Sequence, residues 1–399
     1  MWIATFVSLS LVTSAISAAI STSSSPVPVV LWHGLGDRYD APGLLSLKTD
    51  LEERPDLKGV FVWIVKLADD GTSDQRATFF GSANDQVAAV CDQLRALPEI
   101  MDPKLNPSGK FDAIGFSQGG QLLRAVVERC GGKGGLNVRN LITVGSQHMG
   151  VSSMPPCPPG SSPFGACRLM HLSIVREGLY SNFAQHKIIP AQYFRDEARI
   201  HDYLSVNNFL RVSSPHNANS IWWAEHGRHA LTPFRLTTQD INNERVGDKE
   251  VGPPADNAGL FDEEDNPEPR NETYKENFSA LENLVLLRFS EDATVVPPQS
   301  AHFTLPSPYA HNCPSPADPL DPSCYLDPLP YSYLPLFAYD YIGLRQLDLK
   351  DKIYRGVCEG QHMEIRDDCW DLIASWLGKG DGQAQRVETP DRGRLVVQL

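Results

Sequence analysis

Short, mostly apolar runs alternate along this chain with longer segments in which apolar residues recur at helical spacing. The short runs lie at 27–32, 60–65, 111–114, 141–144, 284–289 and 353–357. Such runs are typical of parallel strands that are buried on both faces. The alternation holds before Gly150 and again after Ala280. We therefore predict an α/β protein with a doubly wound, mostly parallel sheet that is interrupted between these two residues.

Two amphipathic segments predict particular helices. Asn84 is expected to cap the first, whose apolar stripe consists of Val87, Val90, Cys91, Leu94 and Leu97. The second runs over 368–377 and follows the last predicted strand. It is expected to close the fold.

The segment Gly115-Phe116-Ser117-Gln118-Gly119 matches the G-x-S-x-G pattern of a nucleophile elbow. A predicted strand precedes it, and an amphipathic helix over 118–130 follows it. Glycine is needed on both sides of a serine at such a sharp turn, because a Cβ atom would clash with the neighbouring strand and helix. A chance pentapeptide in a loop is the alternative. The flanking strand and helix favour the elbow and make Ser117 a candidate nucleophile.

A serine nucleophile needs an acid and a base, which in α/β-hydrolases follow it in that order. The fifth apolar run is followed at once by Glu291 and Asp292, and we assign the acid to Asp292. Three histidines come later. His302 follows its strand too closely and His311 lies in a proline-rich stretch, so His362, after the last predicted strand, is the predicted base. The plain alternatives are a solvated turn carboxylate and a surface-loop histidine.

Two backbone N–H groups must form the oxyanion hole of such a site. Gln118 supplies one by its position after the serine. We assign the other to Leu35, within the glycine-bearing loop His33-Gly34-Leu35-Gly36-Asp37 that follows the first apolar run. A loop of this kind also suits a phosphate, but the chain has no G-x-G-x-x-G and no lysine-bearing P-loop. No cofactor is therefore expected.

Six segments carry a more specific pattern. They read LWHGLGD at 31–37, AIGFSQGGQ at 113–121, VGSQHMGV at 144–151, DINNER at 240–245, NETYK at 271–275 and EGQH at 359–362. In this order they resemble the lysosomal palmitoyl-protein thioesterase family, over most of 29–377. The resemblance implies an α/β-hydrolase fold and hydrolysis of S-acylated proteins. It also implies the triad Ser117, Asp292 and His362, which the chain order selects independently.

The residue pattern, together with the resemblance for the lid and the insertions, suggests how the chain is divided. We expect a signal peptide at 1–19, the hydrolase core at 20–150 and 281–377, a lid at 151–280, a Pro-rich insertion at 305–337 and a disordered tail at 378–399. Relative to the family, insertions are expected near 211–238, 246–270 and 305–337. The first two fall in the expected lid, where a substrate is selected, so the lid shape and the particular acyl-protein stay open.

The N-terminal segment 1–19 combines an apolar stretch with small residues at Ser17 and Ala19, although it lacks Lys and Arg. We expect a cleaved signal peptide rather than a membrane anchor, because the apolar stretch is short and rich in serine. The secretory pathway is therefore expected, with a lysosome, a vacuole or the extracellular medium as the destination.

Eight cysteines in a chain with a predicted secretory signal indicate disulfides, although the sequence does not determine their pairing. The resemblance implies two pairs, Cys91 with Cys130 and Cys157 with Cys167. Elimination leaves Cys313 with Cys324 and Cys358 with Cys369. The chain contains no C-x-x-C and no H-E-x-x-H, so no metal site is expected.

Asn271 and Asn277 begin N-x-S/T sequons, and we expect both to be glycosylated. The formal net charge of −14 disfavours nucleic acid as a partner. S-acylated proteins or peptides are the expected substrates, with acyl-CoA as a further candidate, and we expect a monomer. The adjacent Trp222 and Trp223 suit a peripheral membrane contact, although anchoring their own insertion is the more ordinary role.

Two other functions remain open. A secreted lipase or carboxylesterase would use the same triad, and turnover of a triglyceride instead of an acyl-protein would reveal it. A catalytically silent hydrolase-fold binding protein is the second, which a complete triad disfavours. Hydrolysis of palmitoyl-thioester, short-chain thioester and triglyceride separates these three functions.

Overall fold

The computed structural model describes residues 26–154, 157, 162, 164–196, 199, 202–203, 206–207, 209–210, 271–305 and 334–378. The strands are β1 Val29–Trp32, β2 Val62–Ile64, β3 Phe111–Phe116, β4 Val138–Val144, β5 Asn283–Phe289 and β6 Ile353–Cys358. The α-helices are α1 Pro42–Glu53, α2 Gly71–Ala77, α3 Ala83–Arg95, α4 Pro98–Met101, α5 Gln118–Cys130, α6 Ala166–Glu177, α7 Asn182–Lys187, α10 Glu272–Ser279, α11 Pro335–Ala338, α12 Leu344–Leu349 and α13 Asp367–Ala374. Short 3₁₀ turns lie at Pro55–Leu57, Ile189–Tyr193 and Pro298–His302.

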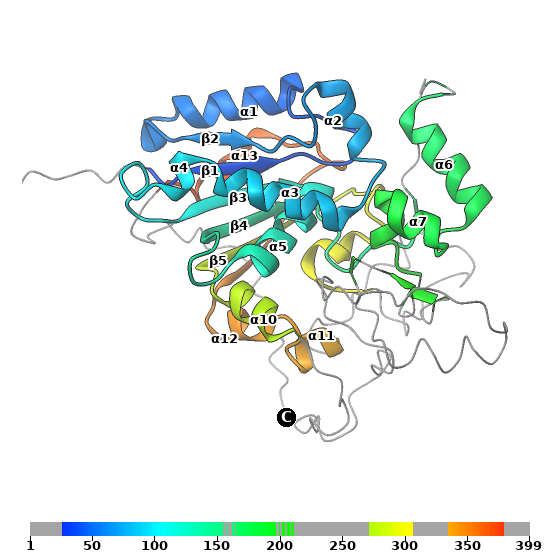
Figure 1. Ribbon diagram of the computed structural model, residues 1–399. Coiled ribbons are helices and arrows are strands. Elements are labelled where there is room, and N and C mark those ends of the chain that lie inside the picture. The colour runs from blue at the N-terminus through cyan, green and yellow to red at the C-terminus, as the bar shows by residue number, and fades with distance from the viewer. Residues whose placement is uncertain are drawn as a thin grey trace, which may run out of the picture.

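The six strands form one sheet in the order β2-β1-β3-β4-β5-β6, and every neighbouring pair is parallel (Figure 1). Parallel strands place all their carboxyl ends at the same edge of the sheet. The loops after β1, β3, β5 and β6 therefore meet there. The predicted α/β fold is confirmed.

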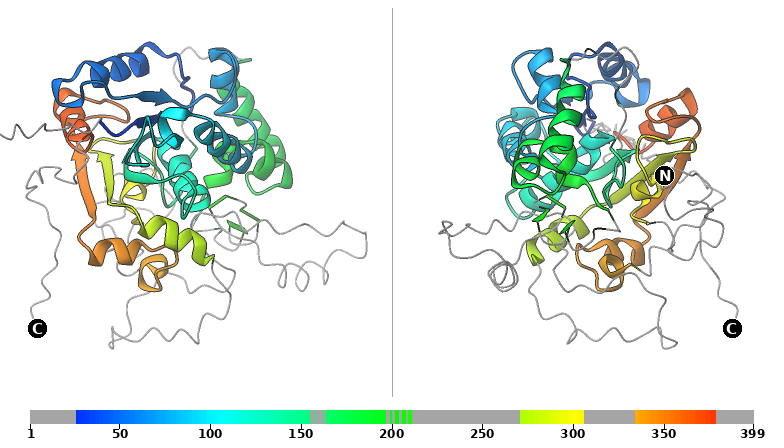
Figure 2. Two further views of the ribbon diagram at one scale, coloured as in Figure 1. Left: turned by 60° about the vertical axis from the view of Figure 1, so that its left-hand side comes forward. Right: turned by 90° about the vertical axis from the view of Figure 1, so that its right-hand side faces the viewer.

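Both faces of the sheet are covered by helices, which explains the continuous apolar runs. On one face, alternate strand residues such as Val30, Ala113 and Leu284 pack with α3, α5, α10 and α12. On the other, residues such as Leu31 and Ile114 pack with α1 and α13. The right-hand view of Figure 2 shows α13, in orange-red, on the opposite side of the molecule from the cyan α3.

Two local features differ from the sequence-based expectation. The cap of α3 is Ser82, whose Oγ accepts a hydrogen bond from Asp85 N at 3.2 Å, whereas Asn84 lies inside the helix. The extended backbone of Ser82 allows this capping bond. Strand β4 begins before its apolar run, because the buried Arg139 pairs with Asp112 of β3, with Nε 2.9 Å from Oδ1. Because the opposite charges of Arg139 and Asp112 are paired, both side chains can be buried within the sheet.

The segment between β4 and α10 interrupts the sheet and contributes α6 and α7, which stand beside the sheet, beyond α2 (Figure 1). Of the remaining expectations, the following lie outside the described residues: the signal peptide, His311, Trp222, Trp223, Cys313 and Cys324, and nearly all of the three insertions and the tail. Within the described residues, no helix has the length and hydropathy needed to cross a membrane.

Candidate active site

Ser117 stands in a sharp turn between β3 and α5. Its φ of 50° and ψ of −120° are unusual for a residue with a side chain and indicate a strained backbone. A Cβ atom on Gly115 would lie 2.1 Å from Gly120 Cα, and one on Gly119 would lie 2.2 Å from Trp32 O. The flanking positions therefore need glycine, because the turn packs against the neighbouring helix and strand.

The side chains of Ser117, His362 and Asp292 form a hydrogen-bonded row. Nε2 of His362 lies 3.0 Å from Ser117 Oγ, and Nδ1 lies 2.8 Å from Asp292 Oδ2. A carboxylate only accepts hydrogen bonds, so Nδ1 carries the proton and donates to Asp292. Nε2 is then left to accept the hydroxyl proton of Ser117. This arrangement can activate the serine as a nucleophile.

Both partners of Ser117 are held by their own loops. Asp292 Oδ1 accepts from the backbone N–H groups of Thr294 and Val295 at 2.9 Å each, which fixes the carboxylate. The His362 ring packs edge-on against Phe289, with centroids 5.9 Å apart. The Asp292 side chain is 1% exposed and that of His362 is 12% exposed, so the row is reached from solvent mainly at the histidine.

The loops that carry the acid and the base are joined to each other. Ser290 Oγ donates to Glu359 Oε2 at 2.9 Å, and Glu291 N donates to Gly360 O at 2.9 Å. Glu291 is exposed, and the carboxylate that faces His362 Nδ1 is that of Asp292. The sequence pattern includes Glu359 only as part of the EGQH segment and does not include Ser290, because their pairing depends on the adjacency of β5 and β6.

The two candidate oxyanion donors flank the serine. Gln118 is the first residue of α5, where a backbone N–H has no partner within the helix. The loop with Leu35 approaches from β1, and a Cβ atom on Gly34 would lie 3.0 Å from Ser117 Cβ. Among the described residues, neither Leu35 N nor Gln118 N has a hydrogen-bond acceptor. Both N–H groups are therefore free to bind an oxyanion.

His302 lies away from this row. Its Nε2 is 3.0 Å from Gly356 O, and burial lowers the pKa of His302 to about 3. The ring is therefore neutral, and its Nε2 is turned to β6 instead of to the serine. His302 ends the short 3₁₀ turn Pro298–His302 that follows β5, whereas the predicted base follows β6.

A buried polar group behind the serine includes His148 of the family-like segment 144–151. Arg124 of α5 lies with its Nε 3.1 Å from Glu128 Oε1, and one guanidinium nitrogen donates to His148 O at 3.3 Å. His148 Nε2 lies 2.9 Å from Thr143 Oγ1, and its ring stacks on Phe303 with centroids 4.5 Å apart. These side chains pack α5 against the sheet, so they support the serine turn from behind.

Burial raises the pKa of Glu128 to about 8, and the charge of Arg124 offsets this only in part. The folded protein holds this proton up to about pH 8, whereas an exposed glutamate loses it near its ordinary pKa of 4.5. The stabilisation from Glu128 is therefore fully present below that ordinary pKa and is lost as pH rises through the folded value.

We expect Glu128→Gln to flatten the pH dependence of stability, because glutamine has no proton to lose. Between pH ~5 and ~8 its Tm should fall less than that of the wild type, by a few °C. Thermal unfolding across this range measures the effect, with Glu276→Gln, an exposed glutamate of α10, as the control. Parallel curves for wild type and Glu128→Gln would contradict the expectation.

Three of the expected disulfides are present. Cys91–Cys130 joins α3 to α5. Cys157–Cys167 joins the segment before α6 to the first turn of that helix. Cys358–Cys369 joins β6 to α13 and closes the loop that contains His362. All six of these cysteines are paired, and the described residues include no free cysteine. Cys157, Cys167 and His171 lie close together, but both sulfurs are committed to a disulfide.

The two sequons differ in their surroundings. Asn271 is half-buried at the start of α10. Asn277 is buried, and its Nδ2, the atom that would carry a glycan, donates to Glu128 O at 2.8 Å. A sequon does not report burial, so the expectation for Asn277 does not fit the folded protein. Asn271 is retained as the candidate.

In protein secreted from a eukaryotic host, we expect a glycan on Asn271 and none on Asn277, because a glycan would break the contact between α10 and α5. Glycopeptide mass spectrometry of the folded fraction measures occupancy at each site. Asn271→Gln should remove the glycan signal. An occupied Asn277 in folded, monodisperse protein would contradict this assignment.

Comparison with known proteins agrees with the fold and with the segments noted above. Residues 28–221 and 239–362 match the sequence profile of the family described as palmitoyl protein thioesterase. The chain is 29% identical over 356 residues to palmitoyl-protein thioesterase 1 of Caenorhabditis elegans, covering 88% of this chain and 90% of the relative. It is 25% identical over 360 residues to palmitoyl-protein thioesterase 3 of Dictyostelium discoideum, covering 89% and 92%.

The profile spans well over half of the chain and includes every residue of the serine–histidine row. The parallel sheet and the serine turn are those of an α/β-hydrolase. The chain therefore belongs to the palmitoyl protein thioesterase family and is a thioester hydrolase.

Proposed function

We propose that this protein hydrolyses the thioester bond of long-chain S-acylated proteins through Ser117, His362 and Asp292. The observation that carries this proposal is the row of contacts from Ser117 Oγ to His362 at 3.0 Å and on to Asp292 at 2.8 Å. The names of the relatives, which are palmitoyl-protein thioesterases, support the substrate class.

In the first half of the reaction, Ser117 Oγ attacks the thioester carbonyl while His362 Nε2 takes its proton. The negative charge that develops on the carbonyl oxygen is stabilised by the N–H groups of Leu35 and Gln118. The C–S bond then breaks, and the leaving cysteine sulfur takes the proton from His362, which returns to its neutral form. The acyl group stays on Ser117 as an ester.

In the second half, His362 removes a proton from water, and the resulting hydroxide attacks the acyl-serine. The tetrahedral intermediate uses the same oxyanion donors. Ser117 leaves with the proton from His362, and a fatty acid is released. Asp292 keeps Nδ1 protonated throughout, so that Nε2 can accept and return one proton in each half.

We propose that residues 151–280 form a lid over the site. A long acyl chain must be buried there, and at ~0.8 kcal/mol per CH₂ its burial favours long chains over short ones. Acyl-CoA offers the same thioester and is a second candidate substrate.

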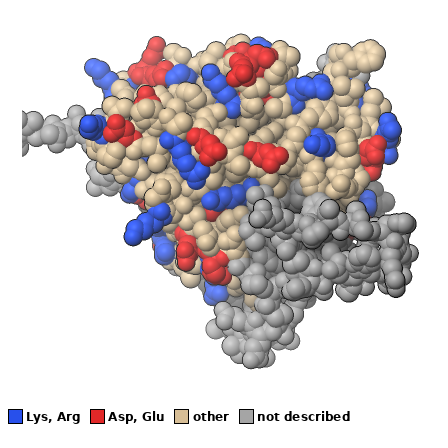
Figure 3. Space-filling view, viewed as in Figure 1, with Lys and Arg blue, Asp and Glu red and all other residues tan. Residues whose placement is uncertain are grey.

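On the face shown in Figure 3, acidic and basic side chains are interspersed, an ordinary surface for a protein in solution.

The three disulfides fit the secretory pathway. We propose a lysosomal or vacuolar lumen, or the extracellular medium, as the place of action. We propose further that the enzyme acts as a monomer, and that a peripheral membrane contact is the alternative to anchoring their own insertion as the role of Trp222 and Trp223.

Purified enzyme should be offered a palmitoylated peptide, palmitoyl-CoA, a short-chain thioester and a triglyceride. We expect the palmitoyl-thioesters to be cleaved with the highest kcat/KM. Preference for the triglyceride would favour a lipase. Absence of turnover together with absence of fluorophosphonate labelling of Ser117 would favour a binding protein and overturn the proposal.

A further inference from the structure

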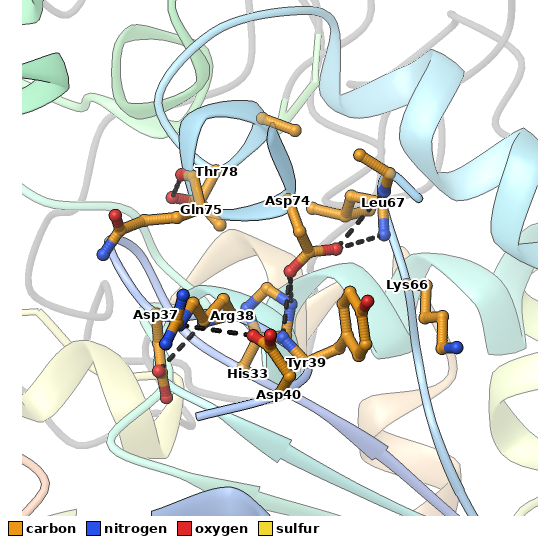
Figure 4. A network of polar contacts seen from close by, with 12 residues as sticks. His33, Asp37, Arg38, Tyr39, Asp40, Lys66, Leu67, Asp74, Gln75 and Thr78 are labelled. Atoms are coloured by element: carbon orange, nitrogen blue, oxygen red, sulfur yellow. Dashed lines mark hydrogen bonds and ion pairs between the residues drawn. The ribbon is translucent and has the colours of Figure 1, made fainter. Parts of the chain in front are cut away.

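Residues 33–39, which make up most of the loop between β1 and α1, are attached at both ends to one carboxylate. His33 Nε2 lies 2.9 Å from Asp74 Oδ2, and Tyr39 N donates to the same oxygen at 3.0 Å. Both His33 and Asp74 side chains are completely buried. Figure 4 shows Asp74 descending from α2 onto the two ends of this loop.

The middle of the loop is held by the end of the same helix. Gly36 N donates to Thr78 Oγ1 at 2.8 Å, and Gly36 O accepts from Gln75 Nε2 at 2.6 Å. Gly36 has a φ of +80°, and a Cβ atom there would lie 3.3 Å from Phe79, so the peptide next to Leu35 is enclosed on this side. Both backbone polar groups that follow Leu35 are thus fixed.

The other candidate donor is connected to the same residue. Gln118 Nε2 donates to Thr78 O at 3.2 Å, and Gln118 Oε1 accepts from Tyr193 Oη at 3.0 Å. Thr78 therefore contacts the Leu35 loop through its side chain and Gln118 through its backbone. It is 1% exposed and follows the last residue of α2.

We propose that Asp74 and Thr78 are positioning residues that set the spacing of the two oxyanion donors, Leu35 N and Gln118 N. This inference rests on the proposed function, because it assigns a task to residues around the oxyanion site. Neither side chain touches the serine–histidine row. Asp74 and Thr78 instead fix the positions of two N–H groups beside Ser117, although these groups come from segments more than 80 positions apart in the sequence.

The chemistry of Asp74 suits this task. Its Oδ1 accepts from Leu67 N at 2.6 Å and from Ala68 N at 3.3 Å, in addition to the two contacts of Oδ2. Although burial raises it, the contact with His33 and the backbone N–H groups lower the pKa of Asp74 overall. The carboxylate therefore stays charged and joins the loops after β1 and β2 to α2.

Thr78→Val and Thr78→Ser form a matched pair that tests the proposal. Valine keeps the shape but removes the acceptor of Gly36 N, whereas serine keeps the hydroxyl. An oxyanion forms only in the transition state, so we expect Thr78→Val to lower kcat about tenfold to hundredfold with KM within about twofold. Thr78→Ser should retain at least about half of the wild-type kcat.

The rate of fluorophosphonate labelling at Ser117 supplies the second measurement, because the phosphoryl oxygen occupies the oxyanion site. It should fall in Thr78→Val in parallel with kcat, and Asp74→Asn should show the same pattern if it folds. Asp70→Ala is the control for a weakened α2, since it removes the N-terminal cap, in which Asp70 accepts from Thr72 N, Ser73 N and Ser73 Oγ. It should lower Tm and leave kcat unchanged at 25 °C.

The outcomes test the positioning role and the proposed function separately. If wild-type Ser117 is labelled and Thr78→Val is labelled equally fast with unchanged kcat, the positioning role is wrong and the proposed function stands. If Asp70→Ala loses as much kcat as Thr78→Val, the effect is general loosening and the positioning role is also wrong. If the wild type is not labelled at Ser117, the proposed function fails and this inference fails with it.

Discussion

Replacement of Ser117 by alanine is expected to reduce kcat/KM for a palmitoyl-thioester by about four to six orders of magnitude. The variant loses the only atom that forms the acyl-enzyme, while His362, Asp292 and both oxyanion donors remain. Alanine keeps the Cβ atom and fits the same backbone, so neither Gly115 nor Gly119 has to move. Hydrolysis should be measured with substrate in large excess and over long incubation.

The control for this prediction is the folded state of the variant. Its Tm and circular dichroism should match those of the wild type, because only one hydroxyl is removed and the backbone is unchanged. Retention of more than about a hundredth of wild-type activity in a folded variant would transfer the nucleophile to another residue. Covalent capture of a radiolabelled acyl group by wild type but not by Ser117→Ala would support the serine directly.

The strands were predictable because parallel strands buried on both faces must be apolar over their whole length. The runs at 284–289 and 353–357 correspond to Asn283–Phe289 and Ile353–Cys358 within one residue at each end. The beginning of β4 was not predictable in this way. Its Arg139 is buried by pairing with Asp112, a partner 27 positions away that only the sheet brings alongside.

The candidate site was predictable to the extent that chain order fixes it. Elbow, acid and histidine follow predicted strands, and the carboxyl ends of parallel strands share one edge, so their proximity follows from the topology. The support of the Leu35 loop was not predictable. Asp74 lies in a polar stretch of sequence with no motif, and its role appears only when α2 is packed over the loop.

Burial was the other property that the sequence did not reveal. Asn277 carries a valid sequon but faces α5, and His302 stands after a strand but turns its Nε2 to Gly356 O of β6. Both assignments depend on which face of a short element points inward. The 3₁₀ turn at Pro298–His302 and the eight-residue α10 are too short for periodicity to settle that question.

The second large loss of activity is expected when Asp292, the acid, is replaced. We expect Asp292→Asn to lower kcat by about three to four orders of magnitude with little change in KM. Asp292 Oδ1 is occupied by the N–H groups of Thr294 and Val295, so an asparagine there keeps its oxygen on that side. Its NH₂ group then faces His362 Nδ1, which must accept instead of donate. The proton moves to Nε2, and the ring can no longer accept from Ser117.

Glu291→Gln provides the matched control, since it removes the neighbouring carboxylate, which is exposed, and leaves the row intact. We expect its kcat to stay within about twofold of the wild type, and both variants should keep their Tm within a few degrees. Steady-state hydrolysis of a soluble palmitoyl-thioester compares the two. A loss of less than tenfold in Asp292→Asn, or an equal loss in Glu291→Gln, would move the acid role away from Asp292. The two neighbours differ in burial and partners but not in charge, so the comparison isolates the hydrogen bond to His362 from the general effect of removing one carboxylate near the site.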